Sequence, residues 1–147
     1  MPEPAFLEPT VAVCGQLKPD DLPEIAQRGF RAIVNNRPDG EAWVGQPRAS
    51  SLDEAAAAVG IASHLIDFTM PTLTAEHARR LSAVLERAEG PVLVFCASGF
   101  RSALLWAIVR AAAGTPIDDL MKAAAAAGQP LEKHRETIER LAAEVRG

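Results

Sequence analysis

One stretch, residues 91–102, constrains the fold more than any other part of the chain. Its sequence is PVLVFCASGFRS. Four consecutive apolar residues, Val92 to Phe95, predict a short strand buried on both faces, because no polar residue alternates with them. The apolar residues from Ala103 to Val109 then predict a helix that ends near Gly114. A strand, a tight loop and a helix in this order direct backbone N–H groups and a helix dipole at one point.

The loop between this strand and helix carries a cysteine and an arginine. A helix N-terminus and a nearby guanidinium both stabilise a thiolate, the reactive form of cysteine. We therefore predict that Cys96 is a nucleophile and that Arg101 binds the anion it attacks. The other loop residues are expected to line the anion site: Ala97, Ser98, Gly99, Phe100 and Ser102. The alternative is a core cysteine, the usual fate of a free thiol, beside an unrelated surface arginine.

Composition limits the partners of this site. The chain has 147 residues, enough for one domain with its own core, and we expect residues 1–147 to form a single domain. A net charge of −4 argues against nucleic acid and anionic membranes as partners. The N-terminus lacks the features of a signal peptide, and two cysteines make a disulfide framework improbable, so we expect a cytoplasmic protein. The three histidines are scattered, so we expect no metal and no cofactor.

Hydrophobic patterning along the rest of the chain predicts the fold class. Further strands are expected over residues 11–14, 30–35 and 61–66. They alternate with helices expected to begin near Lys18, Leu52, Thr74, Pro116 and Glu132, whereas residues 42–51 are expected to form a loop. Alternating strands and helices predict an α/β fold: a mainly parallel central sheet with helices on both faces. Ligands bind such sheets beyond the carboxyl ends of the strands, where Cys96 lies.

The loop from Cys96 to Ser102 resembles the active loops of two groups of enzymes, the cysteine-dependent protein phosphatases and the rhodanese sulfurtransferases. Phosphatases generally place five residues between cysteine and arginine, which makes a ring wide enough for a phosphate. Here four residues separate Cys96 from Arg101, as in many single-domain rhodaneses. The spacing therefore favours a sulfur atom over a phosphoryl group.

A wider resemblance covers roughly residues 10–140. Together with the loop at 96–102 and Leu105-Trp106, the segments 15–19 (GQLKP) and 35–41 (NNRPDGE) resemble the bacterial family of beta-lactamase-hydrolase-like, phosphatase-like domains. The resemblance implies a fold like that of dual-specificity phosphatases. Family members are described as phosphatases or as sulfurtransferases, and some are fused to metallo-β-lactamase-type enzymes that process persulfides, which makes such an enzyme an expected partner. Ala97 stands where the family commonly has arginine, so one positive charge of the loop is missing.

Two chemistries remain open for Cys96. The favoured hypothesis is sulfane-sulfur transfer from thiosulfate or a persulfide through a Cys96 persulfide, which needs no strong general acid. The alternative is a protein tyrosine or dual-specificity-type phosphatase that forms a phosphocysteine and acts on a phosphorylated substrate. That reaction needs a general acid. Asp67 is the candidate, although alignment of the preceding strand puts the usual acid position nearer Met70, and Phe95 stands where phosphatases usually have histidine.

The sequence leaves open a non-catalytic alternative and the functions of Arg37, Asp39 and Cys14. A fold of this kind could be a non-catalytic module that binds anions or phosphoproteins, but the presence of both Cys96 and Arg101 argues against it. Arg37 and Asp39 follow the second expected strand and could support the active loop, or Arg37 could simply pair with a carboxylate of its turn. Cys14 is expected to be an ordinary buried thiol; otherwise it could resolve a persulfide or disulfide of Cys96.

Overall fold

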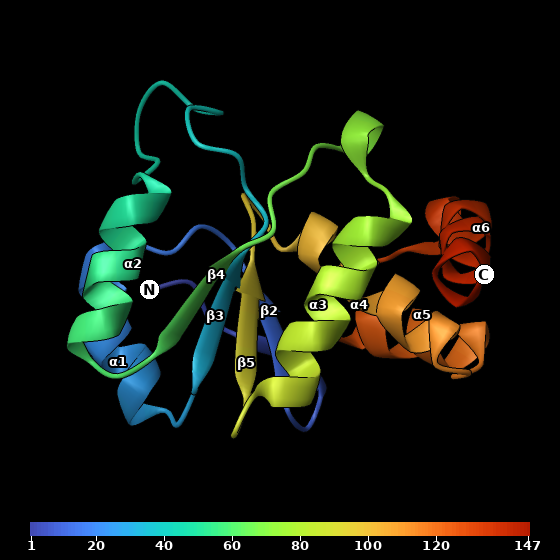
Figure 1. Cartoon of the computed structure of the whole chain (residues 1–147), viewed down its shortest axis with the longest axis horizontal. Helices are drawn as coiled ribbons and strands as arrows, with labels where there is room; N and C mark the ends of the chain where they lie inside the picture. The colour runs from blue at the N-terminus through green and yellow to red at the C-terminus, as the bar shows by residue number, and fades with distance from the viewer.

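A five-stranded sheet runs through the middle of the molecule (Figure 1). The computed structural model describes all residues, 1–147. The strands are β1 (Ala5–Glu8), β2 (Val11–Cys14), β3 (Ala32–Asn35), β4 (Ala62–Leu65) and β5 (Val92–Phe95). Their order across the sheet is β1-β2-β5-β3-β4, so the strand that leads to Cys96 lies at the centre.

The four strands β2 to β5 are parallel, and only β1 is antiparallel to its neighbour β2. The prediction of a mainly parallel sheet is therefore confirmed. β1 was not predicted from the sequence, and the strand expected to come first, residues 11–14, is the second of the chain. The pattern of β1 is weak because only Leu7 of its four residues is buried, and it is flanked by Pro4 and Pro9.

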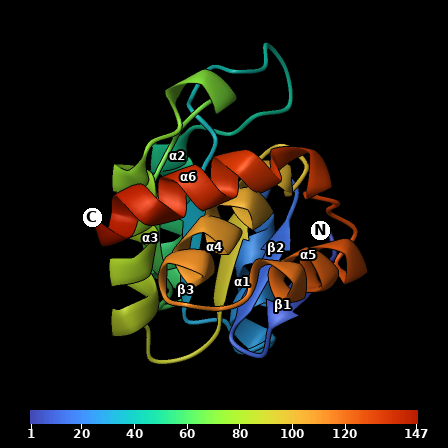
Figure 2. The same ribbon diagram turned by 90° about the vertical axis from the view of Figure 1, so that its right-hand side faces the viewer.

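Helices cover both faces of the sheet, as predicted (Figures 1 and 2). One face carries α1 (Leu22–Gln27) and α2 (Ala49–Ala58); the other carries α3 (Ala75–Arg87), α4 (Phe100–Ala112), α5 (Ile117–Ala126) and α6 (Arg135–Arg146). The predicted loop over 42–51 is wrong at its end, since α2 already begins at Ala49. No helix combines the length and the apolar character needed to cross a bilayer.

The central strand contributes to two separate hydrophobic cores. Val92 and Val94 belong to the cluster under α3, α4, α5 and α6, whereas Leu93 and Phe95 belong to the cluster under α1 and α2. All four side chains are at most 1% exposed, which is why no polar residue interrupts the strand.

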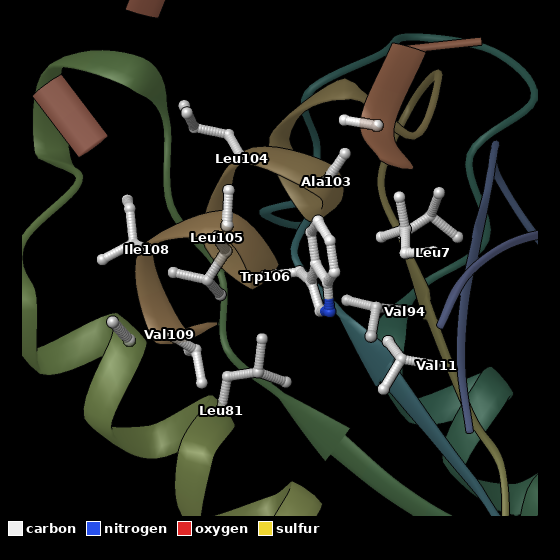
Figure 3. Packing of buried hydrophobic residues seen from close by; sticks show 14 of the residues in the cluster. Leu7, Val11, Leu81, Val94, Ala103, Leu104, Leu105, Trp106, Ile108 and Val109 are labelled. Carbon is white, nitrogen blue, oxygen red and sulfur yellow. The ribbon is translucent and has the colours of Figure 1, made fainter. Parts of the chain in front are cut away.

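The larger core is centred on α4 (Figure 3). Its apolar residues surround the helix, so α4 is buried between the sheet and α3, α5 and α6. The indole of Trp106 lies near Val11, Val94 and Leu7 in Figure 3, and its N–H donates to the carboxylate of Glu8 on β1. The helix that follows the cysteine loop is thus held firmly against the sheet.

Leu93→Ala tests the smaller core. Leu93 is fully buried, so truncation should leave a cavity and lower the free energy of unfolding by about 2–5 kcal/mol. The matched control is Leu65→Ala on edge strand β4, where the leucine is 39% exposed and the loss should be about 1 kcal/mol or less. Urea unfolding followed by circular dichroism measures both, and equal losses would contradict the assignment of the core.

Candidate active site

The sulfur of Cys96 lies at the carboxyl end of β5, at the start of the loop that leads into α4. The residue is 1% exposed. The backbone N–H of Gly99 donates to Sγ across 3.1 Å, so the sulfur faces a backbone donor at the start of α4. Gly99 has a φ of +93°, and a Cβ at this position would lie 2.8 Å from Nε2 of Gln129. Only glycine fits both the backbone conformation and the space.

The loop carbonyls are held by residues outside the loop. The Ala97 oxygen accepts a hydrogen bond from the backbone N–H of Gln16 at 3.4 Å, and the Ser98 oxygen accepts one from Nε2 of Gln129 at 3.0 Å. In a trans peptide the C=O and the following N–H point in opposite directions. The N–H groups of Ser98 and Gly99 are therefore turned away from Gln16 and Gln129, and that of Gly99 reaches the sulfur.

The first turn of α4 adds further donors. The backbone N–H groups of Phe100, Arg101 and Ser102 have no acceptor within the protein, as expected for the start of a helix. These donors and the positive end of the helix dipole favour a negative charge beside Cys96. The hydroxyl of Ser102 is turned elsewhere, and the ring of Phe100 packs edge-on against His134. The predicted loop residues therefore form a cup around the Cys96 sulfur that is made mainly of backbone, and their binding of an anion stays a prediction.

Arg101 is fixed by a carboxylate that the sequence did not single out. Its Nη1 and Nη2 donate to Oε2 and Oε1 of Glu41 at 2.8 and 2.7 Å, and Nη1 also donates to the Phe68 carbonyl at 3.1 Å. The side chain is only 13% exposed. The hydrogen bonds to Glu41 raise the pKa of Arg101 above its ordinary value, and the negative charge of the nearby Cys96 sulfur raises it further. The predicted pair of Cys96 and Arg101 thus lies close together.

The remaining N–H groups of Arg101 point to its function. A guanidinium has five N–H groups, and both on Nη1 and one on Nη2 are engaged by Glu41 and Phe68. The N–H of Nε and the second N–H of Nη2 donate to no oxygen of the protein, and a hydrogen bond from the Arg101 side chain to the Cys96 sulfur contributes to the raised pKa of Arg101. These two are parallel and form the fork that binds two oxygens of one oxyanion. Glu41 therefore holds Arg101 through its two Nη atoms, and the adjacent edge of Nε and Nη2 donates to no protein oxygen.

A buried amide joins the site to the sheet. Asn36 is 0% exposed; its Oδ1 accepts from the hydroxyl of Ser102 at 2.8 Å, and its Nδ2 donates to the Ile66 carbonyl at 2.9 Å. Its backbone N–H donates to Phe95, and its carbonyl accepts from Phe68. One residue after β3 thus links the end of β5, the first turn of α4 and the segment that follows β4.

Arg37 and Asp39 have different functions in the structure. Arg37 donates to Glu41 at 2.9 Å through Nε and to the side chain of Gln16 at 3.0 Å through Nη1, so it supports both Arg101 and the loop indirectly. Asp39 accepts the backbone N–H of Ala49 at 2.8 Å and thereby fixes the start of α2. The two arginines around Glu41 lower the pKa of its carboxyl, mainly through the hydrogen bond from Arg101, although partial burial opposes the shift.

Asp67, the candidate general acid, follows β4 at the same end of the sheet. It is half-buried, and its carboxylate accepts no hydrogen bond from the protein. The residues on either side are fixed to the site: the Ile66 carbonyl by Asn36, and the Phe68 carbonyl by Arg101. Met70, the other position considered for the acid, begins a 3₁₀ turn and is 37% exposed.

Two other groups lie outside the cup. Cys14 ends β2 and is 5% exposed, and burial raises the pKa of its thiol to about 12, with further contributions from Cys96 and Asp21. A surface cavity of about 740 Å³ lies between β4 and α3 and includes Arg80 and His64 but not Cys96. Burial lowers the pKa of His64, so this histidine lines the cavity as an uncharged side chain at neutral pH.

Sequence reasoning missed three residues that organise the site: Asn36, Glu41 and Gln129. The first two stand in the segment 35–41, whose likeness to a known family was noted, but only Arg37 and Asp39 were selected from it. Gln129 lies in an irregular segment after α5, where no local pattern marks it.

Solved structures with the same architecture include a putative phosphatase from Neisseria meningitidis Z2491, which is 32% identical. Its TM-score is 0.83, and the match covers 93% of this chain and 96% of that chain. Another is kinase associated phosphatase with its catalytic site cysteine replaced by serine, at 13% identity, a TM-score of 0.77, and coverage of 98% and 96%. The sheet, the helical layers and the cysteine loop therefore define the fold of the dual-specificity-like cysteine phosphatases.

The family is defined more narrowly by sequence. Residues 4–113 match the family described as "Beta-lactamase hydrolase-like protein, phosphatase-like domain". A beta-lactamase hydrolase-like protein of Agrobacterium fabrum is 35% identical over 104 residues, which are 71% of this chain and 24% of that protein. The chain belongs to this phosphatase-like domain family, as its sequence motifs indicated. It spans about a quarter of the length of the curated relatives it matches.

The two cysteines should differ in reactivity with iodoacetamide. At pH 8 a thiol with a pKa of about 12 is ionised in about one molecule in ten thousand, so Cys14 should remain unmodified in the folded protein. Cys96 should be labelled first, because burial raises the pKa of Cys14, whereas the Cys96 sulfur faces the backbone N–H of Gly99 at the start of α4. Peptide mass spectrometry measures both, and protein unfolded in urea, in which both should react, is the control. Rapid labelling of Cys14 in the folded protein would contradict this assignment.

Proposed function

We propose that this chain is a cysteine-dependent phosphatase that hydrolyses phosphate monoesters through Cys96. The observation that carries the proposal is the Nε and Nη2 edge of Arg101, which donates to no protein oxygen and lies beside inward-turned amides and a Cys96 sulfur that accepts a backbone N–H. A phosphoryl group needs donors for its equatorial oxygens and a nucleophile below the phosphorus. This arrangement offers both.

In the first step, the Cys96 thiolate attacks phosphorus, an S–P bond forms, and the P–O bond to the leaving group breaks. The leaving oxygen takes a proton from Asp67, whose neighbours Ile66 and Phe68 are both hydrogen-bonded to site residues. Glu41 is unsuited to this function, because both of its carboxylate oxygens are bound by Arg101 and one of them also by Arg37. The fork of Arg101 and the first-turn amides of α4 hold the equatorial oxygens throughout.

In the second step, water attacks the phosphocysteine. The proton of the water passes to Asp67, now a carboxylate, the P–S bond breaks, and inorganic phosphate and the thiolate of Cys96 are released. The hydrogen bond from the Gly99 N–H to Sγ favours this departure, because it stabilises the thiolate. Asp67 thus serves as acid in one step and as base in the next.

The comparisons support phosphatase chemistry more than sulfur transfer, which the sequence favoured because of the loop spacing, the uncertain general acid and the phenylalanine at position 95. The family is phosphatase-like by description, and a relative at 32% identity is called a putative phosphatase. The names of more distant solved structures enter only as indications of fold.

Sulfur transfer remains the second candidate because of the short loop. Only four residues separate Cys96 from Arg101, and Ala97 adds no charge, so the cup is well suited to a single sulfur atom. The thiolate would attack the outer sulfur of thiosulfate, releasing sulfite and leaving a Cys96 persulfide. An acceptor thiolate would then attack the outer sulfur of this persulfide, becoming a persulfide itself and releasing the Cys96 thiolate. A metallo-β-lactamase-type enzyme that processes persulfides would be a partner for this reaction.

The two chemistries separate in one set of assays. We expect the wild-type protein to hydrolyse p-nitrophenyl phosphate, and Cys96→Ser to abolish turnover, because an alcohol keeps its proton where a thiol ionises. Asp67→Asn should lower kcat by about 10²–10⁴ for leaving groups of high pKa and much less for p-nitrophenolate, which leaves without a proton. Steady-state kinetics at several pH values measures these effects.

The control for protein quality is the circular dichroism spectrum of each variant. Two results together would contradict the phosphatase proposal and support sulfur transfer: a one-sulfur mass gain on Cys96 with thiosulfate, and no release of phosphate from any ester. Full activity in Cys96→Ser would exclude both.

Glu41→Gln tests the positioning of Arg101. The variant loses one of the two charge-assisted hydrogen bonds, so kcat should fall by about tenfold. Affinity for inorganic phosphate should change little, because loss of a nearby negative charge opposes loss of the fixed orientation. The matched control is Glu24→Gln, which removes an exposed ion pair to Arg28 and should leave kcat unchanged. An unchanged kcat in Glu41→Gln would show that Arg101 needs no such partner.

A further inference from the structure

Strand β4 forms one edge of the sheet, and no strand pairs with its outer side. The backbone N–H of Ala62 donates to the Arg31 carbonyl at 3.1 Å, toward the inner neighbour β3. Alternate residues of a strand direct their backbone groups to opposite sides, so those of Ser63 and Leu65 point outward. The outer side of β4 therefore presents backbone donors and acceptors to which a further strand could bond.

A surface cavity opens beside this edge. It has a volume of about 740 Å³ and lies between β4 and α3, which are neighbours in Figure 1. Four residues of α3 line it at helical spacing, which places them on one side of the helix: Arg80, Ala83, Val84 and Arg87. The outer edge of β4 and this side of α3 are the two walls of one groove, named here the β4–α3 groove.

Most of the outward backbone groups of β4 have no partner in the protein. Nη2 of Arg80 donates to the Leu65 carbonyl at 2.6 Å, which confirms that this carbonyl faces α3. The Ser63 carbonyl and the N–H groups of Ser63 and Leu65 make no such bond. A strand edge that adjoins a cavity and retains unpaired groups is suited to pairing with an extended chain.

The charge of the groove is positive, although the net charge of the chain is −4. Arg80 and Arg87 form no salt bridge, whereas Arg31 is paired with Glu89 at 3.5 Å. Arg80 and Arg87 are seven residues apart, so their Cα atoms are separated by about 10.5 Å along the axis of α3. His64 adds no charge at neutral pH, because burial lowers its pKa. The groove thus complements a partner that carries several negative charges along its length.

We propose that the β4–α3 groove is a docking site for an acidic segment of a partner polypeptide, which binds in an extended conformation and adds a strand to the sheet. The backbone of this segment bonds to the outward groups of Ser63 and Leu65. Its carboxylates bind Arg80 and Arg87. A small anion would use the arginines but not the strand edge, so an extended acidic peptide accounts for both features. The inference goes beyond the proposed function and does not depend on Cys96.

Three synthetic peptides test the proposal on the wild-type protein. The probe is a heptapeptide of alternating glutamate and valine, blocked at both ends. In one control peptide lysine replaces glutamate, and in the other proline replaces valine, which keeps the charge but prevents strand pairing. Calorimetry should give the probe at least about tenfold higher affinity than either control, because only the probe has both the charge and the backbone donors.

Amide hydrogen exchange measured by NMR locates the bound peptide. In the free protein, the N–H groups of Ser63 and Leu65 should exchange readily, whereas that of His64 faces β3 and should be protected. At saturating peptide, exchange at Ser63 and Leu65 should slow by about tenfold or more. Exchange at His64 should stay unchanged, which makes this residue an internal control.

Variants test the charges of the groove. The double variant Arg80→Gln, Arg87→Gln should lower affinity for the probe by about five- to tenfold, because two charge pairs are lost. The matched control is Arg28→Gln with Arg140→Gln, which removes two exposed arginines outside the groove and should change affinity less than about twofold. Circular dichroism verifies the fold of each variant, and Cys96→Ser should bind the probe as the wild type does.

Three results would overturn the proposal. Equal binding of the proline peptide would show that charge alone acts and that no strand is added. Competition by inorganic tripolyphosphate at the affinity of the probe would assign the groove to a small anion. Protection of Ser63 and Leu65 that rises with protein concentration, without peptide, would assign it to a second copy of this chain. Absence of phosphate hydrolysis in a protein that binds the probe would refute the proposed function alone.

Discussion

The geometry of the site depends on the four hydrogen bonds of Asn36. This one buried residue connects the ends of β3 and β5, the first turn of α4 and the segment after β4. Each of its polar groups has a partner, so the amide is satisfied without water. An unpaired polar group at such a depth would cost about 1–3 kcal/mol, and a different side chain would leave at least two of its partners unpaired. Asn36 binds Ser102 and Ile66, the neighbours of Arg101 and Asp67 in the chain, so its hydrogen bonds help to position both residues.

Electrostatic balance at the cup comes from a set of three charges, Arg37, Glu41 and Arg101. One carboxylate between two guanidinium groups leaves a net positive charge beside a sulfur that can become negative. Because the pKa of Glu41 is lowered, the stabilisation from this set is fully present above its ordinary pKa of 4.5 and is lost as the pH falls through the lower value in the folded protein. The set therefore stays intact throughout the range in which a cysteine nucleophile operates.

The sequence predicts contiguous features well and long-range polar contacts poorly. The unit of β5, loop and α4 could be predicted because its apolar run, its small-residue loop and its helix start are adjacent in the chain. Arg101 and Cys96 lie on that unit, so their proximity followed from the local geometry. Glu41 could not be assigned to Arg101, since sixty residues separate them and no periodic pattern marks a polar loop residue. β1 was missed for a related reason: its burial is limited to Leu7, so alternation is barely present.

The strand order has a consequence for how the molecule folds. β5 pairs with β2, residues 11–14, on one side and with β3, residues 32–35, on the other, so its hydrogen bonds join parts of the chain that are far apart in sequence. Long loops must close before these bonds form, which places parallel sheets among the slow-folding topologies. During synthesis on the ribosome, the first 91 residues lack the central strand, and β2 and β3 have no neighbour between them. The thiol and its cup are therefore assembled only when the sheet closes, so a chain that has not completed its fold carries no preformed reactive site.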